Sequence, residues 1–282
     1  MKPILFIIAV FSSLVCSAQT DSTADSISSK SALTLAAIYS NNASYYGQRA
    51  AENIPYAALA ANYELKSGIY FTGQTYKLLN DQTSGLSAGS IGAGVNFKAG
   101  KKLTTDISYS HSFYATYSPL LQAANPDNAT LSFSYQNWIT ASVTGDYAFG
   151  KTNDAFVTAA ISKQISLFSI GKKDIVTITP SADVVGGTQH FYQSYIKEKK
   201  LRDSILGLLP VPILGQQNAS HSDSIATTAF NVLSYNFKLP LAYNRAHYAL
   251  EAAYQLSFLS SHAQTSTGKL NSFLTFSFYY QF

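Results

Sequence analysis

Apolar and polar residues alternate along most of this chain. In the clearest stretch, from Leu131 to Phe149, the odd positions are largely apolar and the even positions are mostly Ser, Thr and Gln. A period of two indicates β-strands with one apolar and one polar face. The pattern predicts about twelve strands, which we place at residues 31–40, 56–65, 68–78, 86–98, 102–115, 129–149, 155–168, 174–183, 187–195, 225–242, 246–258 and 271–282.

The number of strands depends on the short segment 187–195, which follows a turn at Gly186-Gly187. If both chain ends lie on one side of a membrane, the number of strands must be even, and this segment supplies the ninth. Without it, about ten strands result from reassigning other segments.

The composition distinguishes between a membrane β-barrel and a soluble β-sandwich, which would both show this alternation. Charged residues make up 12% of the chain, about half the ~25% usual in soluble domains. The polar faces carry Ser, Thr, Asn and Gln rather than the Lys and Glu that a soluble sandwich turns toward water. No apolar run of ~20 residues, the length of a spanning helix, exists beyond the N-terminus. We therefore expect an all-β, antiparallel transmembrane β-barrel, with a soluble sheet as the alternative.

The N-terminus has the features of an export signal. Lys2 precedes an apolar stretch at residues 4–15, and Cys16-Ser17-Ala18 offers small residues for cleavage before Gln19. This predicts a signal peptide at 1–18, a flexible periplasmic leader at 19–30 and a barrel at 31–282. A lipoprotein signal at Cys16 is the alternative, although Val15 is bulky for one. Cleavage would remove the only Cys, so we expect no disulfide and no thiolate chemistry.

The C-terminal strand carries a family resemblance. Apolar residues occupy every second position up to the last residue, at Leu274, Phe276, Phe278, Tyr280 and Phe282. This pattern resembles the closing strand of Gram-negative outer-membrane β-barrel proteins, over about a dozen residues. The resemblance implies that this strand is the assembly signal read by the barrel-assembly machinery. It also implies a place in the cell outer membrane, with membrane lipid and lipopolysaccharide as partners, and it implies no activity.

Connection lengths alternate, which predicts short periplasmic turns and long extracellular loops. The short ones include 66–68, 99–101, 150–154 and 244–245. Aromatic residues beside them would form the periplasmic girdle: Tyr63, Phe97, Tyr147, Phe149, Tyr243 and Tyr248. Charged residues on the polar faces near these turns would form a lumen cluster in the periplasmic half: Glu64, Asp106, Asp146, Lys238 and Glu251. Such a cluster is either a selectivity ring for cations or a salt-bridged network that fills the barrel.

The segment 193–224 is the least barrel-like part of the chain. Residues 195–206 predict a basic, roughly amphipathic helix, which the Pro-rich residues 209–215 then end. If the helix is extracellular, its cations could contact lipopolysaccharide phosphates, namely Lys197, Lys199, Lys200 and Arg202. The alternatives are a lid over the barrel and a solvated helix in a long loop.

Signatures of catalysis are weak. Outer-membrane phospholipases and lipid A deacylases use a His-x-Ser-Asn sequence, and Ser110-His111-Ser112-Phe113 lacks that Asn. The alternation also turns His111 outward. The five His show no metal-ligand spacing, and no glycine pattern indicates a nucleotide cofactor. A net charge of +4 is too small to indicate that the chain binds nucleic acid.

We expect a small channel for polar or cationic solutes, without cofactor or metal. A closed barrel for surface binding or envelope structure is the first alternative, and a lipid-modifying enzyme is the second.

Overall fold

The computed structural model describes residues 31–80, 85–115, 118–206, 229–265 and 268–282, with the side chains of 200–206 left undescribed. The expected signal peptide and leader, at 1–30, lie outside these ranges. The described elements, in chain order, are β1 (Ala32–Ser40), β2 (Tyr56–Glu64), β3 (Ile69–Leu78), β4 (Ala88–Ala99), β5 (Leu103–Tyr114), the 3-10 helix η1 (Leu121–Ala124), β6 (Asp127–Gln136), β7 (Thr140–Phe149), β8 (Asp154–Ser162), β9 (Ile165–Phe168), β10 (Asp174–Ile178), β11 (Ser181–Gly187), α2 (His190–Leu206), β12 (Asn231–Arg245), β13 (Tyr248–Leu259) and β14 (Leu270–Gln281).

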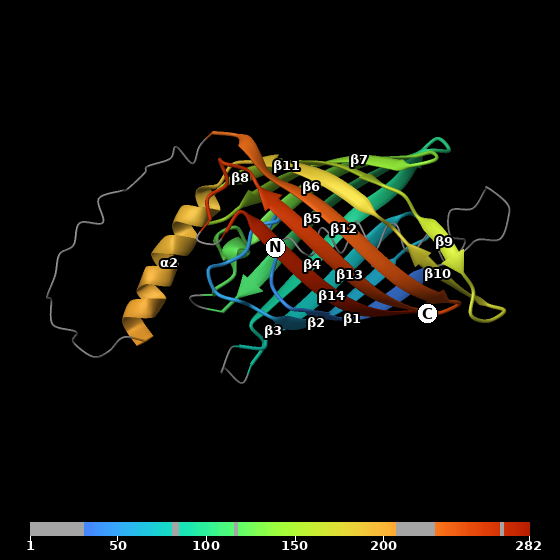
Figure 1. Cartoon of the computed structure of the whole chain (residues 1–282), viewed down its shortest axis with the longest axis horizontal. Coiled ribbons are helices and arrows are strands. Elements are labelled where there is room, and N and C mark those ends of the chain that lie inside the picture. The colour runs from blue at the N-terminus through green and yellow to red at the C-terminus, as the bar shows by residue number, and fades with distance from the viewer. Residues whose placement is uncertain (1–30, 81–84, 116–117, 207–228, 266–267) are drawn as a thin grey trace, which may run out of the picture.

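The strands close into an antiparallel β-barrel (Figure 1). Neighbours in sequence pair in order from β1 to β8, then β8 pairs with β11, and β11 with β12. The ring continues through β13 and β14 and closes where β14 pairs with β1. Twelve strands form the ring. The remaining two, β9 and β10, form a hairpin that extends the wall, where β10 pairs with the last residues of β12. The predicted fold class is confirmed.

The two ends of the barrel differ. We call the end where β1 begins and β14 ends the terminal end, because Thr34 pairs there with Gln281. The β9–β10 hairpin lies at this end too (Figure 1). The opposite end, from which α2 projects, is the helix end. The connection 41–55 and residues 118–126 also lie there, as does the turn between β7 and β8.

The predicted strand 129–149 is in fact two strands, β6 and β7. They are joined by a three-residue turn at the terminal end, where Gln136 pairs with Thr140. Because the turn has an odd number of residues, even-numbered positions point inward on both strands. The alternation therefore continues through the turn without interruption, which is why the sequence pattern conceals it.

The predicted strand 187–195 is wrong. Gly187 is the last residue of β11, and α2 begins at His190. The carboxylate of Asp154 accepts hydrogen bonds from the N–H groups of His190 and Phe191, at 2.7 and 2.9 Å, and so satisfies two donors that the first turn of a helix leaves free. The two errors compensate, so the predicted number of strands agrees with the observed ring.

Because of the missed turn, β7, β8 and β11 run opposite to the expected direction, and the wrongly predicted strand 187–195 restores the expected direction from β12 onward. The connection between Phe149 and Asp154 therefore lies at the helix end and not with the short terminal turns. Tyr147 and Phe149 lie at the helix end as well, where Phe149 packs 6.4 Å from Tyr109. The expectation that they join the girdle beside Tyr63 was wrong.

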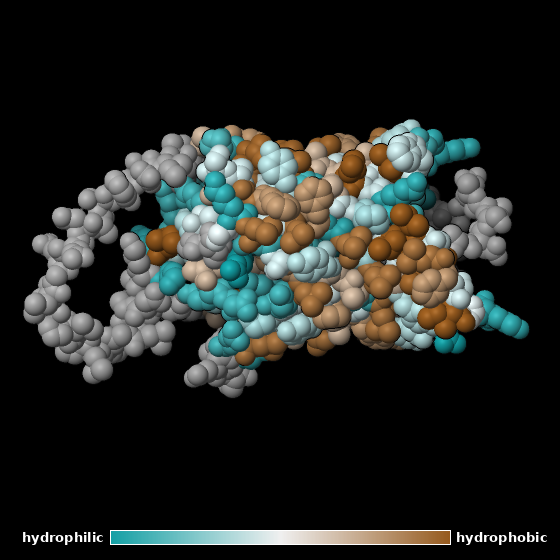
Figure 2. Space-filling model, viewed as in Figure 1, coloured by the Kyte–Doolittle hydropathy of each residue, from teal (hydrophilic) through white to brown (hydrophobic). Residues whose placement is uncertain are grey.

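The wall is apolar outside and polar inside. Outward side chains such as Leu59, Ile91 and Phe133 are exposed, whereas inward ones such as Ser90 are buried. Figure 2 shows apolar residues spread over the strands of the facing wall. Among the described residues, no helix has both the length and the apolar character needed to span a bilayer.

Candidate functional site

The connection between β1 and β2 folds back into the barrel as a plug, by which we mean residues 41–55. Its centre is a small hairpin in which Tyr45 and Gln48 exchange two backbone hydrogen bonds of 2.8 and 3.0 Å. Tyr46 and Gly47 form the turn, with φ angles of 52° and 80°, as a two-residue hairpin turn of type I′ requires. Tyr45 and Gln48 are each only 1% exposed, so the hairpin lies inside the barrel.

The tip of the plug is held by several strands of the wall. The hydroxyl of Tyr46 donates a 2.9 Å hydrogen bond to Oδ2 of Asp146 on β7, and its ring stacks on Phe156 of β8 at 3.9 Å. From strands farther around the ring, Ser234 Oγ of β12 donates to the Tyr46 carbonyl at 2.8 Å, and Asn271 Nδ2 of β14 donates to the Gly47 carbonyl at 3.0 Å. The tip therefore bridges β7 and β8 to β12 and β14.

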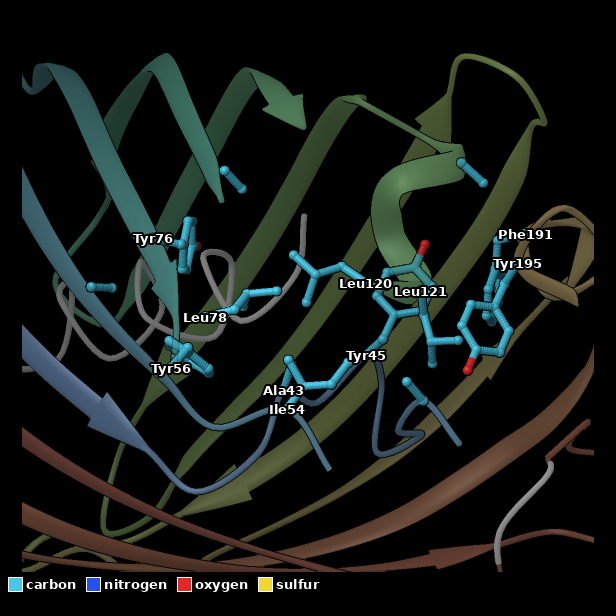
Figure 3. Close-up of a cluster of buried hydrophobic side chains, with 14 of the residues drawn as sticks. Ala43, Tyr45, Ile54, Tyr56, Tyr76, Leu78, Leu120, Leu121, Phe191 and Tyr195 are labelled. Atoms are coloured by element: carbon cyan, nitrogen blue, oxygen red, sulfur yellow. The ribbon is translucent and has the colours of Figure 1, made fainter. Parts of the chain in front are cut away.

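An apolar cluster surrounds the plug at the helix end (Figure 3). Tyr45 of the plug packs edge-on against Phe156 at 5.7 Å and Phe191 at 4.5 Å. Burial, with a contribution from the nearby Asp154, raises the pKa of the Tyr45 hydroxyl well above its ordinary value. The cluster takes side chains from the plug, the strands, η1 and α2, among them Ile54, Tyr56, Tyr76, Leu78, Leu120, Leu121 and Tyr195. The helix-end half of the lumen is thus packed like a protein core.

Asp154, at the start of β8, fixes α2 over this cluster. Its side chain is fully buried. Besides the two N–H groups of α2, it accepts hydrogen bonds from Thr188 Oγ1 at 2.8 Å, Asn125 Nδ2 at 2.9 Å and His190 Nδ1 at 3.1 Å. A carboxylate at a helix N-terminus also interacts favourably with the helix dipole. One side chain therefore joins the β7–β8 turn, η1 and α2.

α2 also contacts the plug directly. Tyr195 Oη accepts a 2.9 Å hydrogen bond from the Ala51 N–H and lies 3.3 Å from Glu52 Oε2. Lys199 Nζ lies 3.3 Å from Glu52 Oε1. Of the cations expected to meet phosphates, Lys199 is thus engaged with the plug, whereas Lys197 is exposed. The side chains of Lys200 and Arg202 lie outside the described part of the structure.

The terminal half of the lumen has a different character. Inward side chains there, such as Ser108, Ser132, Thr144 and Thr158, are partly accessible to solvent. Ser110, two residues nearer the helix end than Ser108, is 8% exposed. Small hydroxyl side chains line the lumen in this half. We call this polar, partly accessible part of the interior the vestibule.

The charged residues expected in one lumen cluster fall into separate groups. At the terminal end, Tyr70 donates to both carboxylate oxygens of Asp106 at 2.9 and 3.0 Å, and Glu64 is paired with Tyr70 across β2 and β3. Asp146 points inward, as expected, but lies at the helix end under the plug. There Thr130 Oγ1 donates to its Oδ1 at 2.7 Å. Its expected place in the other half was wrong because of the missed turn.

A third group includes a carboxylate that the sequence analysis missed. Lys238 on β12 interacts electrostatically with Glu251 on β13 and with Asp183 on β11. Asp183 is 6% exposed and accepts a 2.6 Å hydrogen bond from Asn236 Nδ2. It had been assigned to the end of a strand with the wrong direction. Its place between the apolar neighbours Ala182 and Val184 was the available signal.

His111 points outward, as the alternation indicated. Its Nδ1 lies 2.7 Å from Asp127 Oδ1, which also accepts a 2.5 Å hydrogen bond from the Tyr109 hydroxyl. Ser112 lies on the other face of β5 and is 3% exposed. The wall separates Ser112 from His111, so these two residues cannot act together as a nucleophile and a base. Among the described side chains, no three His, Cys, Asp or Glu residues gather as metal ligands.

The fold and this interior define the chain as a closed antiparallel β-barrel with a plugged lumen. No protein-family model and no curated protein sequence matches it. Among solved structures, it is similar to the KdgM porin, with 8% identity and a TM-score of 0.47 over 89% of this chain and 99% of the porin. It is also similar to LpxR from Salmonella typhimurium, with 8% identity and a TM-score of 0.48 over 88% and 99% of the two chains.

A third similar structure is the COG4313 outer membrane channel from Pseudomonas putida F1. Its identity is 12% and its TM-score 0.43, over 94% of this chain and all of that one. At such scores the likeness is confined to the barrel architecture and assigns no activity to this chain.

Proposed function

We propose that this chain is an outer-membrane β-barrel whose lumen is a cation-preferring channel held closed by the plug. The hydrogen bond of Tyr46 to Asp146, together with the burial of the hairpin behind it, is the observation that carries this proposal. A solute that entered the vestibule from the terminal end would meet the plug before it reached the helix end. Passage would therefore require the plug to move.

The membrane location is supported by the outer surface. Its strands expose large apolar side chains such as Leu59 and Ile91, which would be costly in water and are expected in lipid. In a bilayer only a closed sheet satisfies its backbone groups. We place the terminal end in the periplasm, because the chain would arrive there after removal of the signal peptide. The outward residues from Leu274 on β14 to Phe282, which directly follows β14, would carry the assembly signal.

The cation preference is supported by the charges that face the lumen. Carboxylates outnumber cations along the described inward faces, where Glu64, Asp106, Asp183 and Glu251 accompany Lys238. Partial access of solvent to the terminal half would keep Glu64 and Asp106 hydrated. A wall of one dominant sign concentrates counter-ions in a narrow passage. The solute itself is expected to be small and polar.

A permanently closed barrel for surface binding or envelope structure is the second candidate. The extent of the packing favours it, because the plug contacts β7, β8, β12 and β14 and is covered by α2. A lipid-modifying enzyme has the least support, since Ser112 and His111 lie on opposite faces of the wall.

Conductance in planar lipid bilayers distinguishes these functions. The native barrel is expected to be silent or to open rarely. A variant with residues 44–51 replaced by an equally long Gly-Ser segment should conduct steadily and favour cations. The matched control replaces residues 261–265 in another helix-end loop and should stay closed. Steady conductance of the native barrel would contradict the plug, and silence of the 44–51 variant would favour the permanently closed barrel.

A further inference from the structure

The connections at the terminal end carry a concentration of positive charge. Lys66 lies in the β2–β3 turn, and Lys98, Lys101 and Lys102 lie at the β4–β5 turn. All four are exposed. They cover the part of the barrel's rim that is formed by β2 to β5.

The charge continues around the circumference. Lys163 follows β8, Lys172 and Lys173 lie in the β9–β10 turn, and Arg245 ends β12, all of them exposed. We call these residues, with the four above, the cationic rim. The acid beside them, Asp174, accepts hydrogen bonds of 2.8 Å from the N–H groups of Ile170 and Gly171 and so serves the turn itself.

The helix end does not repeat this arrangement among its described residues. Lys151 is paired with Glu198 at 2.5 Å, and Lys199 with Glu52 at 3.3 Å. Cations and carboxylates are therefore interspersed at that end. The exposed turns of the terminal end are almost uniformly positive, because Glu64 and Asp106 face the lumen rather than the rim.

Two rim cations lie over aromatic rings of the wall. Lys163 Nζ lies 5.2 Å from the ring centre of Trp138, and Lys102 Nζ lies 6.0 Å from that of Tyr135. Aromatic side chains of membrane proteins concentrate at the boundary between hydrocarbon and headgroups. These contacts place the ammonium groups just beyond that boundary. Figure 2 shows hydrophilic side chains projecting from this end of the barrel.

We propose that the cationic rim binds the headgroups of anionic phospholipids in the leaflet that surrounds the terminal end. The ligand class follows from the geometry: the charges encircle the barrel below its apolar belt, where a membrane surface meets every one of them. A folded protein or a nucleic acid would contact only one sector. The inference rests on the proposed membrane location of the barrel.

The test uses Trp138, which is the only Trp in the chain and is 70% exposed beside Lys163. The barrel is inserted into phosphatidylcholine vesicles that contain a small fraction of brominated phosphatidylglycerol or, separately, brominated phosphatidylcholine. Bromine quenches nearby Trp fluorescence, so the ratio of the two signals reports local enrichment. Both leaflets have the same composition, which makes orientation irrelevant. We expect stronger quenching by the anionic lipid, with the difference lost at high salt.

The decisive variant combines Lys66→Gln, Lys101→Gln, Lys172→Gln and Lys173→Gln, all in exposed turns. Enrichment should fall on the order of fivefold for each cation that no longer contacts a headgroup. The matched control removes the same number of cations elsewhere, by Lys77→Gln, Lys151→Gln, Lys197→Gln and Lys269→Gln. It should keep the native enrichment. Heat-dependent electrophoretic mobility verifies that both variants are folded barrels.

Each other result has a defined meaning. Equal quenching of the native barrel by both lipids, or equal losses in the two variants, would overturn the proposal. Displacement of the anionic lipid by soluble glycerol phosphate at a matching concentration would indicate a discrete phosphate pocket and overturn the surface interaction. Absence of quenching by either lipid would contradict the membrane location instead.

Discussion

Tyr46, at the tip of a hairpin inside the barrel, donates a 2.9 Å hydrogen bond to Asp146 on the wall. Asn128 and Thr130 also donate to the other oxygen of the same carboxylate, at 3.2 and 2.7 Å. A buried carboxylate needs such donors, because burial without them is costly. The plug thus supplies one of the hydrogen bonds that a buried carboxylate of the wall requires. The same contact therefore closes the lumen and stabilises the barrel.

Replacing Tyr46 with Phe tests this dependence. Tyr46→Phe removes one donor to Asp146 but keeps the ring stacked on Phe156, so the free energy of unfolding should fall by about 1.5–3 kcal/mol. Urea unfolding in lipid vesicles measures this change. Tyr39→Phe is the control, because Tyr39 faces outward and is 41% exposed. An equal effect of the two substitutions would show that the Tyr46 hydroxyl has no structural role.

A methyl group at Gly47 should displace the plug. Gly47 has a φ of 80°, and a side chain there would clash with Ser234 and Asn236 of β12. Gly47→Ala should therefore cost about 2–4 kcal/mol, from backbone strain plus overpacking, and should produce frequent channel openings in planar bilayers.

Gly100 provides the matched control. Its φ is 81°, and a Cβ atom there would meet nothing within 4 Å. Gly100→Ala carries the same backbone strain, worth about 1 kcal/mol, without the clash. Openings in both variants alike would mean that strain in general, rather than contact between plug and wall, controls the conductance.

The sequence specifies the wall far better than the interior. Alternation at positions such as Phe133 and Val143 reports which side of a strand is apolar, and burial confirms those faces. The direction of a strand is not encoded in this signal. The three-residue turn between Gln136 and Thr140 keeps even-numbered residues on the inward face of both strands. The alternation therefore does not reveal the turn, and Asp146 was assigned to the wrong end of the barrel.

The plug could not be predicted for a related reason. Local patterns report neighbours in sequence, whereas the plug depends on partners that are far away in the chain. Tyr46 meets Asp146 and Ser234, which are 100 and 188 residues distant. A Tyr-Gly turn inside a loop does not predict that the loop inserts into the barrel. The role of Asp154 could not be predicted either, because only the folded barrel brings its carboxylate to the start of α2.

Asp154 should control the attachment of α2. Asp154→Asn leaves a single acceptor oxygen for donors that now use two, and it removes the charge that faces the helix N-terminus. We expect a loss of about 2–3 kcal/mol and faster hydrogen exchange in residues 190–199, measured by mass spectrometry.

Asp174→Asn is the matched control for this substitution. Asp174 also accepts hydrogen bonds from two backbone N–H groups, but it does so in the exposed β9–β10 turn. Exchange in α2 should be unaffected by that change. If α2 keeps its protection in Asp154→Asn, the helix is held by Phe191 and Tyr195 rather than by the carboxylate.

The carboxylates of the vestibule should set ion selectivity once the plug is removed. In the variant with residues 44–51 replaced, Glu64→Gln together with Asp106→Asn should lower the ratio of cation to anion permeability roughly two- to fivefold. Two charges a few ångströms from a hydrated ion contribute about 1 kcal/mol at a dielectric constant near that of water. Lys238→Gln should raise the same ratio, since it removes the inward cation. Reversal potentials in a salt gradient measure both.

Asp127→Asn is the control, because Asp127 binds Tyr109 and His111 on the outer surface and does not face the ion path. If that control lowers selectivity as much as the paired substitution does, the ions do not pass along the inward face defined by the strand register.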